Sequence, residues 1–309
     1  MSSARAAAGS ARQRLLSRSR RRGEDYQVLL VRYALERFVY RLSVSRHADR
    51  FVLKGAMLFA LWADTLDHRP TRDIDLLGRG NPSPAELAAA FRELCLLEVA
   101  VDDGLEFDEA SVAAAPIRED AVYDGVRVVL RARLGTARIR IQVDVGFGDA
   151  VHPVPEIVAY PTLLDHPAPE VAAYHPATVV AEKLEAMVAL GMANSRMKDF
   201  FDLLWMADHM ELDGDQLVAA VRSTFLRRQR ALPQGPPIAL TVDFAEDGSK
   251  QVQWGAFIRK SRLDGREGGL PEVVGCLSAF LGPLLESATG DGSPGHWSPG
   301  GPWRREQRR

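Results

Sequence analysis

Two consecutive segments of alternating hydrophobicity constrain the fold more than any other feature of the chain. In residues 126–134 and 139–145 aliphatic side chains occupy every second position, and most positions between them are arginine, glutamine or aspartate. Successive side chains of a β-strand point to opposite faces, so each segment predicts a strand with one buried and one polar face. The short connection around LGTA favours a tight turn and an antiparallel pair.

The rest of the chain is predominantly helical by periodicity. Apolar residues at helical spacing predict helices over 25–42, 84–98, 177–190, 196–209, 214–227 and 270–285. Short strands are expected at 72–77 and near 157–160, and Gly55 marks a turn before a further helix. We therefore predict an α+β fold, with a mixed or antiparallel sheet flanked by helices in an N-terminal domain and a mainly helical C-terminal domain. The predicted boundaries are a basic disordered arm at 1–22, the sheet domain at 23–165, the helical domain at 166–288 and a disordered tail at 289–309.

Composition excludes several classes of protein. The two cysteines, Cys95 and Cys276, lie far apart, which excludes a disulfide scaffold and a zinc ribbon. No stretch approaches the roughly 18 apolar residues of a membrane-spanning helix. The first apolar segment is interrupted by charged residues, which excludes a signal peptide. We expect a cytoplasmic protein with no membrane association.

The charge of the chain is unevenly distributed. The net charge is −2, yet the first 22 residues contain no acidic residue. The basic residues of this arm are Arg5, Arg12, Arg14, Arg18, Arg20, Arg21 and Arg22. Such an arm could contact nucleic acid. A disordered leader, or a start site assigned too far upstream, explains it equally well.

Two aspartates on a predicted strand are the first candidate site. Asp73 and Asp75 are two residues apart, so their carboxylates share a face and repel each other unless a cation lies between them. Mg²⁺ suits such oxygens because it keeps water ligands that a phosphate can replace. Asp144 lies on the polar face of the second alternating segment, and acids on two neighbouring strands are what two-metal phosphoryl transfer requires. The alternatives are solvated strand acids and an Asp144 that pairs with Arg131 or Arg140.

A lysine on the apolar face of a predicted helix is the second candidate. Lys183 lies within the buried arc of residues 177–190, where it could meet the oxygens of a triphosphate. The alternative is a lysine whose stem is buried and whose amine reaches water. On the next helix Asp199 lies at the edge of the apolar stripe near Arg196, whereas Asp202 is expected to face further outward.

A glycine beside a lysine is a candidate phosphate contact. Gly55 follows Lys54 and precedes a predicted helix, where backbone N–H groups can approach a phosphate. A lone glycine at such a position is more often simply a turn. The sequence contains no Walker loop, dinucleotide-binding glycine fingerprint, GxSxG or HExxH motif, so the chemistries of those motifs have no support.

Five short motifs follow one another along the chain. They are FVLKGAMLF, RPTRDIDLL, IRIQVDVGFGD, HPATVVAEKLEAM and SRMKDFFDLLWM. In this order they resemble the AbiEii/AbiGii toxin family of nucleotidyltransferases, a divergent branch of the DNA-polymerase-β-like nucleotidyltransferases that includes the mycobacterial MenT toxins. The likeness extends over residues 25–257.

The resemblance implies a nucleotidyltransferase domain at 23–165 and a helical domain that closes the nucleotide cleft. It implies metal binding by Asp73, Asp75 and Asp144, and catalytic roles for these three together with Lys183 and Asp199. The implied nucleotide contacts are Lys54, Gly55, Ala56, Arg72, Lys183 and Arg196. The chain departs from the family's usual Gly-Gly pair, because Ala56 follows Gly55; its backbone N–H is still present for a phosphate.

The function implied is Mg²⁺-dependent transfer of a nucleoside monophosphate from an NTP to an RNA hydroxyl, expected at the 3′ end of a tRNA. Two Mg²⁺ ions are expected, and a cognate antitoxin is implied as a partner. The RNA acceptor draws further support from the basic arm and from arginines of the alternating segments, some of which must pair with acids: Arg127, Arg131, Arg133, Arg138 and Arg140. Two alternatives stay open: a catalytically inactive RNA- or protein-binding module, and transfer of a nucleotide or phosphoryl group onto a protein hydroxyl.

Overall fold

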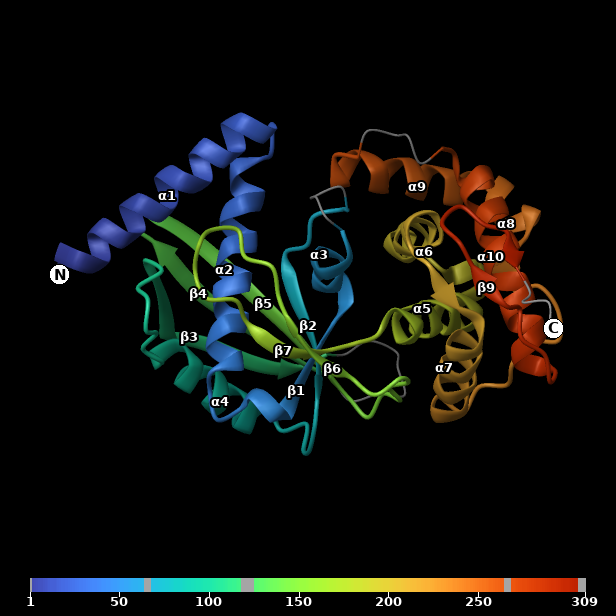
Figure 1. Ribbon diagram of the computed structural model, residues 1–309, viewed down its shortest axis with the longest axis horizontal. Coiled ribbons are helices and arrows are strands. Elements are labelled where there is room, and N and C mark those ends of the chain that lie inside the picture. The colour runs from blue at the N-terminus through green and yellow to red at the C-terminus, as the bar shows by residue number, and fades with distance from the viewer. Residues whose placement is uncertain (1, 64–67, 118–124, 264–267, 305–309) are drawn as a thin grey trace. The chain divides into compact units, whose positions relative to one another are not determined.

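The protein consists of two compact units, seen here in a computed structural model that describes residues 2–63, 68–117, 125–263 and 268–304 (Figure 1). One unit comprises Met1–Asp149 and Pro155–Ala173, and the other Ala150–Val154 and Tyr174–Arg309. The first contains a mixed sheet with helices, and the second is mainly helical, which confirms the predicted α+β class. The chain passes from the first unit to the second after Ala173, eight residues beyond the predicted boundary at 165.

A seven-stranded mixed sheet organises the N-terminal unit. Its strand order is β3-β4-β5-β2-β1-β7-β6. The pairs β2–β5 and β1–β7 are parallel, and the other neighbours are antiparallel. The strands are β1 (Phe51–Lys54), β2 (Asp73–Gly78), β3 (Leu105–Pro116), β4 (Gly125–Leu134), β5 (Ala137–Phe147), β6 (Glu156–Ala159) and β7 (Glu170–Ala173).

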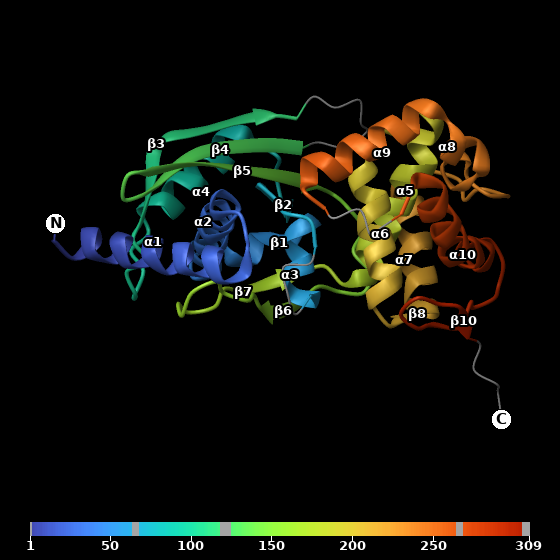
Figure 2. The same ribbon diagram turned by 90° about the horizontal axis from the view of Figure 1, so that it is seen from above.

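The predicted hairpin is confirmed as the β4–β5 pair, with Leu134 opposite Ala137 at the turn. Its aliphatic side chains are buried under α2 (Tyr26–Ser43) and α4 (Pro84–Leu96), which lie on one face of the sheet (Figure 2). The other face of β4 and β5 carries the polar alternate positions. The alternation therefore decides which face packs against helices and which face is available for chemistry.

The segment after Gly55 differs from the predicted helix. A 3₁₀ turn at Gly55–Leu58 and a single helical turn, α3 (Phe59–Trp62), follow β1. The residues before Gly55 form strand β1, which the sequence pattern did not predict. Because β1 has four residues and three of them are buried, it shows no alternation that could be recognised in the sequence.

The basic arm is not disordered, which corrects the prediction for residues 1–22. It forms helix α1 (Ser2–Arg22), and Ala8, Ala11 and Leu15 bury one side of this helix. Gly104 allows the close approach: a Cβ atom there would lie 2.5 Å from the Ala8 backbone. Three small or apolar residues at spacings of three and four are enough to dock the helix. Their partners come from distant parts of the chain, so the local sequence pattern did not indicate the docking.

Helix α2 carries charged residues that are buried rather than solvated. Arg37 and Arg41 donate to the carboxylate of Asp103 at 3.2 and 2.7 Å, and all three are almost fully buried. Glu36 accepts a hydrogen bond from the backbone N–H of Leu163 at 2.7 Å. Burial raises the pKa of Glu36 to about 7, in spite of this hydrogen bond and the neighbouring Arg37. These contacts fix α2 to segments more than sixty residues away.

The described part of the C-terminal unit is built from six helices. They are α5 (Pro176–Leu190), α6 (Met197–His209), α7 (Gly214–Arg227), α8 (Val242–Glu246), α9 (Gly248–Ser261) and α10 (Leu270–Thr289). Of these, α5, α6, α7 and α10 match predicted helices, whereas α8 and α9 were not predicted. The helix α5 begins with Pro176 at its first position and ends at Gly191, whose positive φ of 49° terminates it.

The predicted disordered tail at 289–309 is also corrected, as far as the structure describes it. Strand β9 (His296–Trp297) pairs with β8 (Leu212–Asp213) and β10 (Trp303–Arg304). The indole N–H of Trp297 donates to the Ala207 carbonyl at 2.7 Å, and that of Trp303 to the Phe280 carbonyl at 2.8 Å. Residues 305–309 lie outside the described part of the chain.

Helix α10 is long and apolar enough to cross a membrane by length and composition alone, with a mean hydropathy of 1.2. Half of this segment is buried inside the protein. The core helix of a globular unit passes the same test, so the helix gives only weak evidence for a membrane span. Among the described helices no other meets these criteria.

The docking of α1 is tested by two neighbouring leucines. Leu15 is fully buried and Leu16 is 36% exposed. We expect Leu15→Ala to lower the free energy of unfolding by about 2–4 kcal/mol, because it leaves a cavity. Leu16→Ala is the matched control and should cost less than about 1 kcal/mol. Urea unfolding measures both, and equally small losses would contradict a docked α1.

Candidate active site

One row of four charged residues crosses the centre of the sheet. Lys54 on β1 is the register partner of Asp75 on β2, Asp75 of Asp144 on β5, and Asp144 of Arg127 on β4. Register partners project to the same face, so two adjacent carboxylates stand between two cations. All four are half-buried on the face opposite α2 and α4. The structure thus brings Asp75 and Asp144 together on one side of the sheet.

Gly55 is in direct contact with Asp75. The residue has φ +73°, and a Cβ atom on it would lie 2.0 Å from Oδ2 of Asp75. No side chain can occupy this position without moving the carboxylate. The glycine therefore allows the backbone to lie against the acid, a role different from the turn or phosphate contact considered from the sequence.

Asp73 lies on the same face of β2, two residues before Asp75. The hydroxyl of Thr71 donates to its Oδ1 at 2.6 Å. Its register partner on β5 is Gln142, whose side-chain amide donates to Asp144 at 3.3 Å. Asp73, Asp75 and Asp144 therefore belong to one polar surface, with hydroxyl and amide donors that fix two of the three carboxylates.

Asp149 is a site residue that the sequence analysis did not single out. The Nζ atom of Lys54 donates to its Oδ2 at 2.6 Å, and the Asp149 side chain is only 8% exposed. The motif IRIQVDVGFGD ends at this residue. An acid directly after the strand that carries Asp144 was the available signal. Lys54 thus reaches both the central row and the loop that follows β5.

Asp144 is held by a second residue whose role was missed. Arg127 donates from Nε and Nη2 to the two carboxylate oxygens of Asp144, both at 2.8 Å. The alternative considered from the sequence, a pair with Arg131 or Arg140, is thus met in kind but by a different arginine. Arg127 lies on β4, directly opposite Asp144 in the β4–β5 pair. The alternating pattern placed both residues on the polar face, but it did not show which residues of the two strands lie opposite each other.

The acids fit a hard divalent cation in their chemistry. Asp73, Asp75 and Asp144 supply only carboxylate oxygens on a half-exposed face, which suits Mg²⁺. Across the described residues, no three histidine, cysteine, aspartate or glutamate side chains converge closely enough to hold a metal ion. At Asp144 the opposite charge is provided by Arg127, at 2.8 Å.

The remaining predicted nucleotide contacts in this unit are Ala56 and Arg72. Ala56 lies in the 3₁₀ turn after Gly55, and Arg72 is exposed just before β2. The predicted approach of a phosphate to a helix N-terminus has little support here, because α3 is a single turn and its dipole is correspondingly small.

A second charged cluster lies inside the C-terminal unit. The Nζ atom of Lys183 on α5 donates to Asp199 and Asp202 on α6, both at 2.7 Å. Both carboxylates are essentially inaccessible, so Asp202 faces inward and not outward as predicted. Arg196 donates to Asp199 at 2.6 Å, and its side chain is 47% exposed.

The electrostatics of this cluster depend on its cations. Burial by itself would raise the pKa of Asp199, but the charges of Lys183 and Arg196 outweigh it and hold that pKa below its ordinary value. Two cations balance two buried carboxylates, so the cluster has no net formal charge. Of its two cations, Arg196 is the more exposed.

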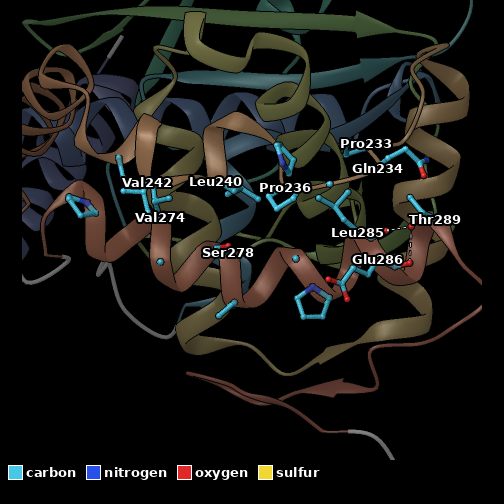
Figure 3. Close-up of a pocket in the computed structure, with 18 of the residues that line it drawn as sticks. Pro233, Gln234, Pro236, Leu240, Val242, Val274, Ser278, Leu285, Glu286 and Thr289 are labelled. Carbon is cyan, nitrogen blue, oxygen red and sulfur yellow. Dashed lines mark hydrogen bonds between the residues drawn. The ribbon is translucent and has the colours of Figure 1, made fainter.

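An apolar groove in this unit is separate from these charges. A groove of about 840 Å³ lies between the proline-rich segment 233–237 and α10 (Figure 3). Its polar lining residues include Ser278, Glu286 and Thr289, and the Thr289 hydroxyl donates back to its own helix. Neither lysine nor arginine is among the described residues that line it, so it does not suit a triphosphate.

The Lys183 cluster makes a testable prediction about stability. Lys183→Met leaves two buried carboxylates side by side and should lower the free energy of unfolding by about 3–5 kcal/mol. Without the lysine the folded-state pKa of these acids rises above the unfolded value, so part of the loss should be recovered as the pH falls.

Urea unfolding between pH 5 and 8 measures the effect. Asp202→Asn in the Lys183→Met background should restore stability, because it removes one of the opposed charges. Lys198→Met, at an exposed position of α6, is the matched control. A Lys183→Met variant as stable as the control would contradict the charge-balancing role.

Comparisons with known proteins connect this geometry to a family. No curated protein was found to match the sequence. Two solved structures from Helicobacter pylori are similar at 14% sequence identity. One is JHP933, with a TM-score of 0.47 over 85% of this chain and 92% of that chain. The other is described as a candidate nucleotidyltransferase, with a TM-score of 0.45 over 85% of this chain and 95% of that chain.

The family comparison covers most of the chain. The model of the family described as "Nucleotidyl transferase AbiEii toxin, Type IV TA system" matches residues 37–276. This range includes the charged row of the sheet and the Lys183 cluster, and it bears out the resemblance drawn from the five motifs. The chain belongs to the AbiEii family of nucleotidyltransferase toxins.

Proposed function

We propose that this nucleotidyltransferase transfers a nucleoside monophosphate from an NTP to an RNA hydroxyl, at the 3′ end of a tRNA, in a Mg²⁺-dependent reaction like that of the MenT toxins. The observation that carries the proposal is the row of Lys54, Asp75, Asp144 and Arg127 across one face of the sheet. Family membership implies an NTP substrate, a cognate antitoxin and, generally, use of a divalent metal ion. We expect the protein to act in the cytoplasm.

Three acids of the sheet would hold the metal. Asp73 and Asp75 are oriented by the Thr71 hydroxyl and by close contact with Gly55, and Asp144 lies beside Asp75. A bound divalent cation supplies charge neutralisation and polarises phosphate oxygens. The protein's own contribution is to hold these carboxylates in a fixed geometry before the substrate arrives.

Asp144 is the acid best placed to polarise the attacking hydroxyl. Arg127 donates a hydrogen bond to each of its carboxylate oxygens, which fixes the plane of the carboxylate. With its plane fixed, the carboxylate can accept a hydrogen bond from the hydroxyl of the acceptor through a remaining lone pair. We therefore assign Arg127 as a positioning residue for Asp144.

Each unit offers its own candidate contacts for the nucleotide. Lys54, the backbone N–H of Ala56 and the exposed Arg72 are the candidates of the N-terminal unit. In the C-terminal unit Arg196 supplies the more exposed charge, with Asp199 orienting it. Lys183 contributes its charge to the same cluster, where it keeps the two aspartates ionised.

The central acid gives the test of this function. Asp75→Asn should reduce incorporation of labelled nucleotide into RNA by at least about 100-fold, because it removes charge from the reacting centre. The fold should be kept, since the change relieves repulsion between Asp75 and Asp144. Incubation with total RNA, Mg²⁺ and each labelled NTP measures incorporation, and Glu170→Gln, at an exposed position of β7, is the control.

The product of the same assay separates the alternatives. Label in protein and not in RNA would overturn the RNA acceptor in favour of a protein hydroxyl. A wild-type protein that neither labels any acceptor nor binds Mg²⁺-NTP by calorimetry would be an inactive binding module. Unchanged labelling by Asp75→Asn would remove this row from the catalytic machinery.

Arg127 provides a prediction that concerns metal binding alone. Arg127→Gln should bind Mn²⁺ or Mg²⁺ about tenfold more tightly without NTP, because the competing charge on Asp144 is gone. Isothermal titration calorimetry measures this affinity. Arg20→Gln, which removes a charge from an exposed position of α1, should leave it unchanged. Weaker binding by Arg127→Gln would show that the guanidinium prepares Asp144 for the metal instead of competing with it.

A further inference from the structure

Two pairs of arginines face each other on the open side of the β4–β5 hairpin. Arg131 is the register partner of Arg140, and Arg133 of Arg138. All four side chains are exposed. Opposite residues of antiparallel strands have Cβ atoms about 4.5–5.5 Å apart, and like charges in such pairs destabilise a sheet. Two successive pairs of this kind therefore have a cost that folding alone does not explain.

The neighbouring acids do not neutralise this arginine quartet. On β3, Asp108 lies opposite Arg131 and Glu106 opposite Arg133. Two acids against four arginines leave a formal charge of +2. In the described part of the chain, no ion pair within 4.0 Å involves a guanidinium of the quartet. Arg127, at the end of the same polar face, is by contrast fully engaged with Asp144.

The quartet borders a cavity of about 860 Å³ on the polar face of β4 and β5. Its other lining residues include Asp108, Ser111 and Val129, and no described aromatic side chain is among them. A surface of this kind offers guanidinium groups and no ring on which a base could stack. It suits recognition of phosphate, independent of base sequence.

The quartet lies on the same polar face of the sheet as the charged row that contains Asp144 and Arg127. On β5, Arg140 and Arg138 lie four and six residues before Asp144. At about 3.4 Å per strand residue these separations are roughly 14 and 20 Å. A stacked strand that rises about 3.4 Å per nucleotide covers them with about four to six nucleotides. A strand whose terminal hydroxyl reaches Asp144 can therefore place its phosphates over the arginines.

We propose that the arginine quartet binds the phosphate backbone of the RNA acceptor, four to six nucleotides from the hydroxyl that is modified. This inference rests on the proposed function. Bidentate donation from a guanidinium to phosphate oxygens is favourable, and a phosphate between opposed arginines also removes their mutual repulsion. Recognition of the backbone leaves the choice of acceptor to the shape of the RNA rather than to its sequence.

The other basic surface of this unit, on α1, has acidic partners. Arg14 pairs with Asp165 at 2.6 Å, and Arg18 with Glu24 at 3.2 Å. These arginines help to attach the helix to the unit. The exposed Arg20 and Arg21 of α1 have the same chemistry as the quartet without its position beside the catalytic row, which makes them a matched control.

The experiment compares Arg131→Gln/Arg140→Gln with Arg20→Gln/Arg21→Gln. Binding of fluorescently labelled bulk tRNA is measured by anisotropy over a range of salt concentrations. The quartet variant should lose about tenfold or more in affinity, and its dependence of log K on log salt should flatten by about 1.4–1.8. It should be at least as thermostable as the wild type and bind Mg²⁺-NTP equally well. In turnover, KM for tRNA should rise while kcat at saturation stays the same.

Each other outcome overturns one specific idea. If the wild type binds and labels tRNA and the quartet variant behaves like the control, the acceptor lies elsewhere and only this inference fails. If the wild type neither binds nor labels tRNA, the proposed RNA acceptor fails first. If the variant loses binding to phosphatidylserine-containing vesicles and keeps its affinity for tRNA, the quartet is a membrane-binding surface.

Discussion

The parallel pairing of β2 with β5 is the constraint on which the candidate site depends. It places Asp75 and Asp144 side by side at a strand spacing of about 4.8 Å. Two carboxylates at this distance repel each other, so the flanking strands must supply compensation. Lys54 and Arg127 do so from β1 and β4, and Gly55 makes room for the acid from the loop beyond β1. The site is thus built from short-range contacts across four neighbouring strands.

The buried charges described above are balanced by close partners. Inside the N-terminal unit Asp103 satisfies two arginines of α2, and inside the C-terminal unit Lys183 joins two buried aspartates. Buried Glu185 is likewise held by Arg228 and Arg230. The arginine quartet differs from this pattern. Its like charges face each other on an exposed surface, and no ion pair with another described residue neutralises them. Folding therefore supplies a reason for the buried pairs and none for the quartet.

Local periodicity accounts for what the sequence could predict. Alternation identified β4 and β5, and it placed Asp144 on the polar face. It carried no information about which distant strand lies beside β5, because the partner β2 is more than fifty residues away in the sequence. The same limit explains the error at α1, whose few apolar residues meet partners from remote loops. Asp202 was placed outward because a helical projection cannot show that Lys183 reaches across from α5.

The formal charge of the site bears on how many cations the proposed chemistry would use. Lys54 and Arg127 stand against four carboxylates, those of Asp73, Asp75, Asp144 and Asp149, which gives −2 in all. One divalent cation would neutralise this set. A second would leave it at +2, a state that becomes favourable only when the phosphates of an NTP bring their own negative charge. Because such coupling is reciprocal, the second cation and the NTP would each strengthen the binding of the other. On the proposed function, we therefore expect two ions in the substrate complex and one in the protein without NTP.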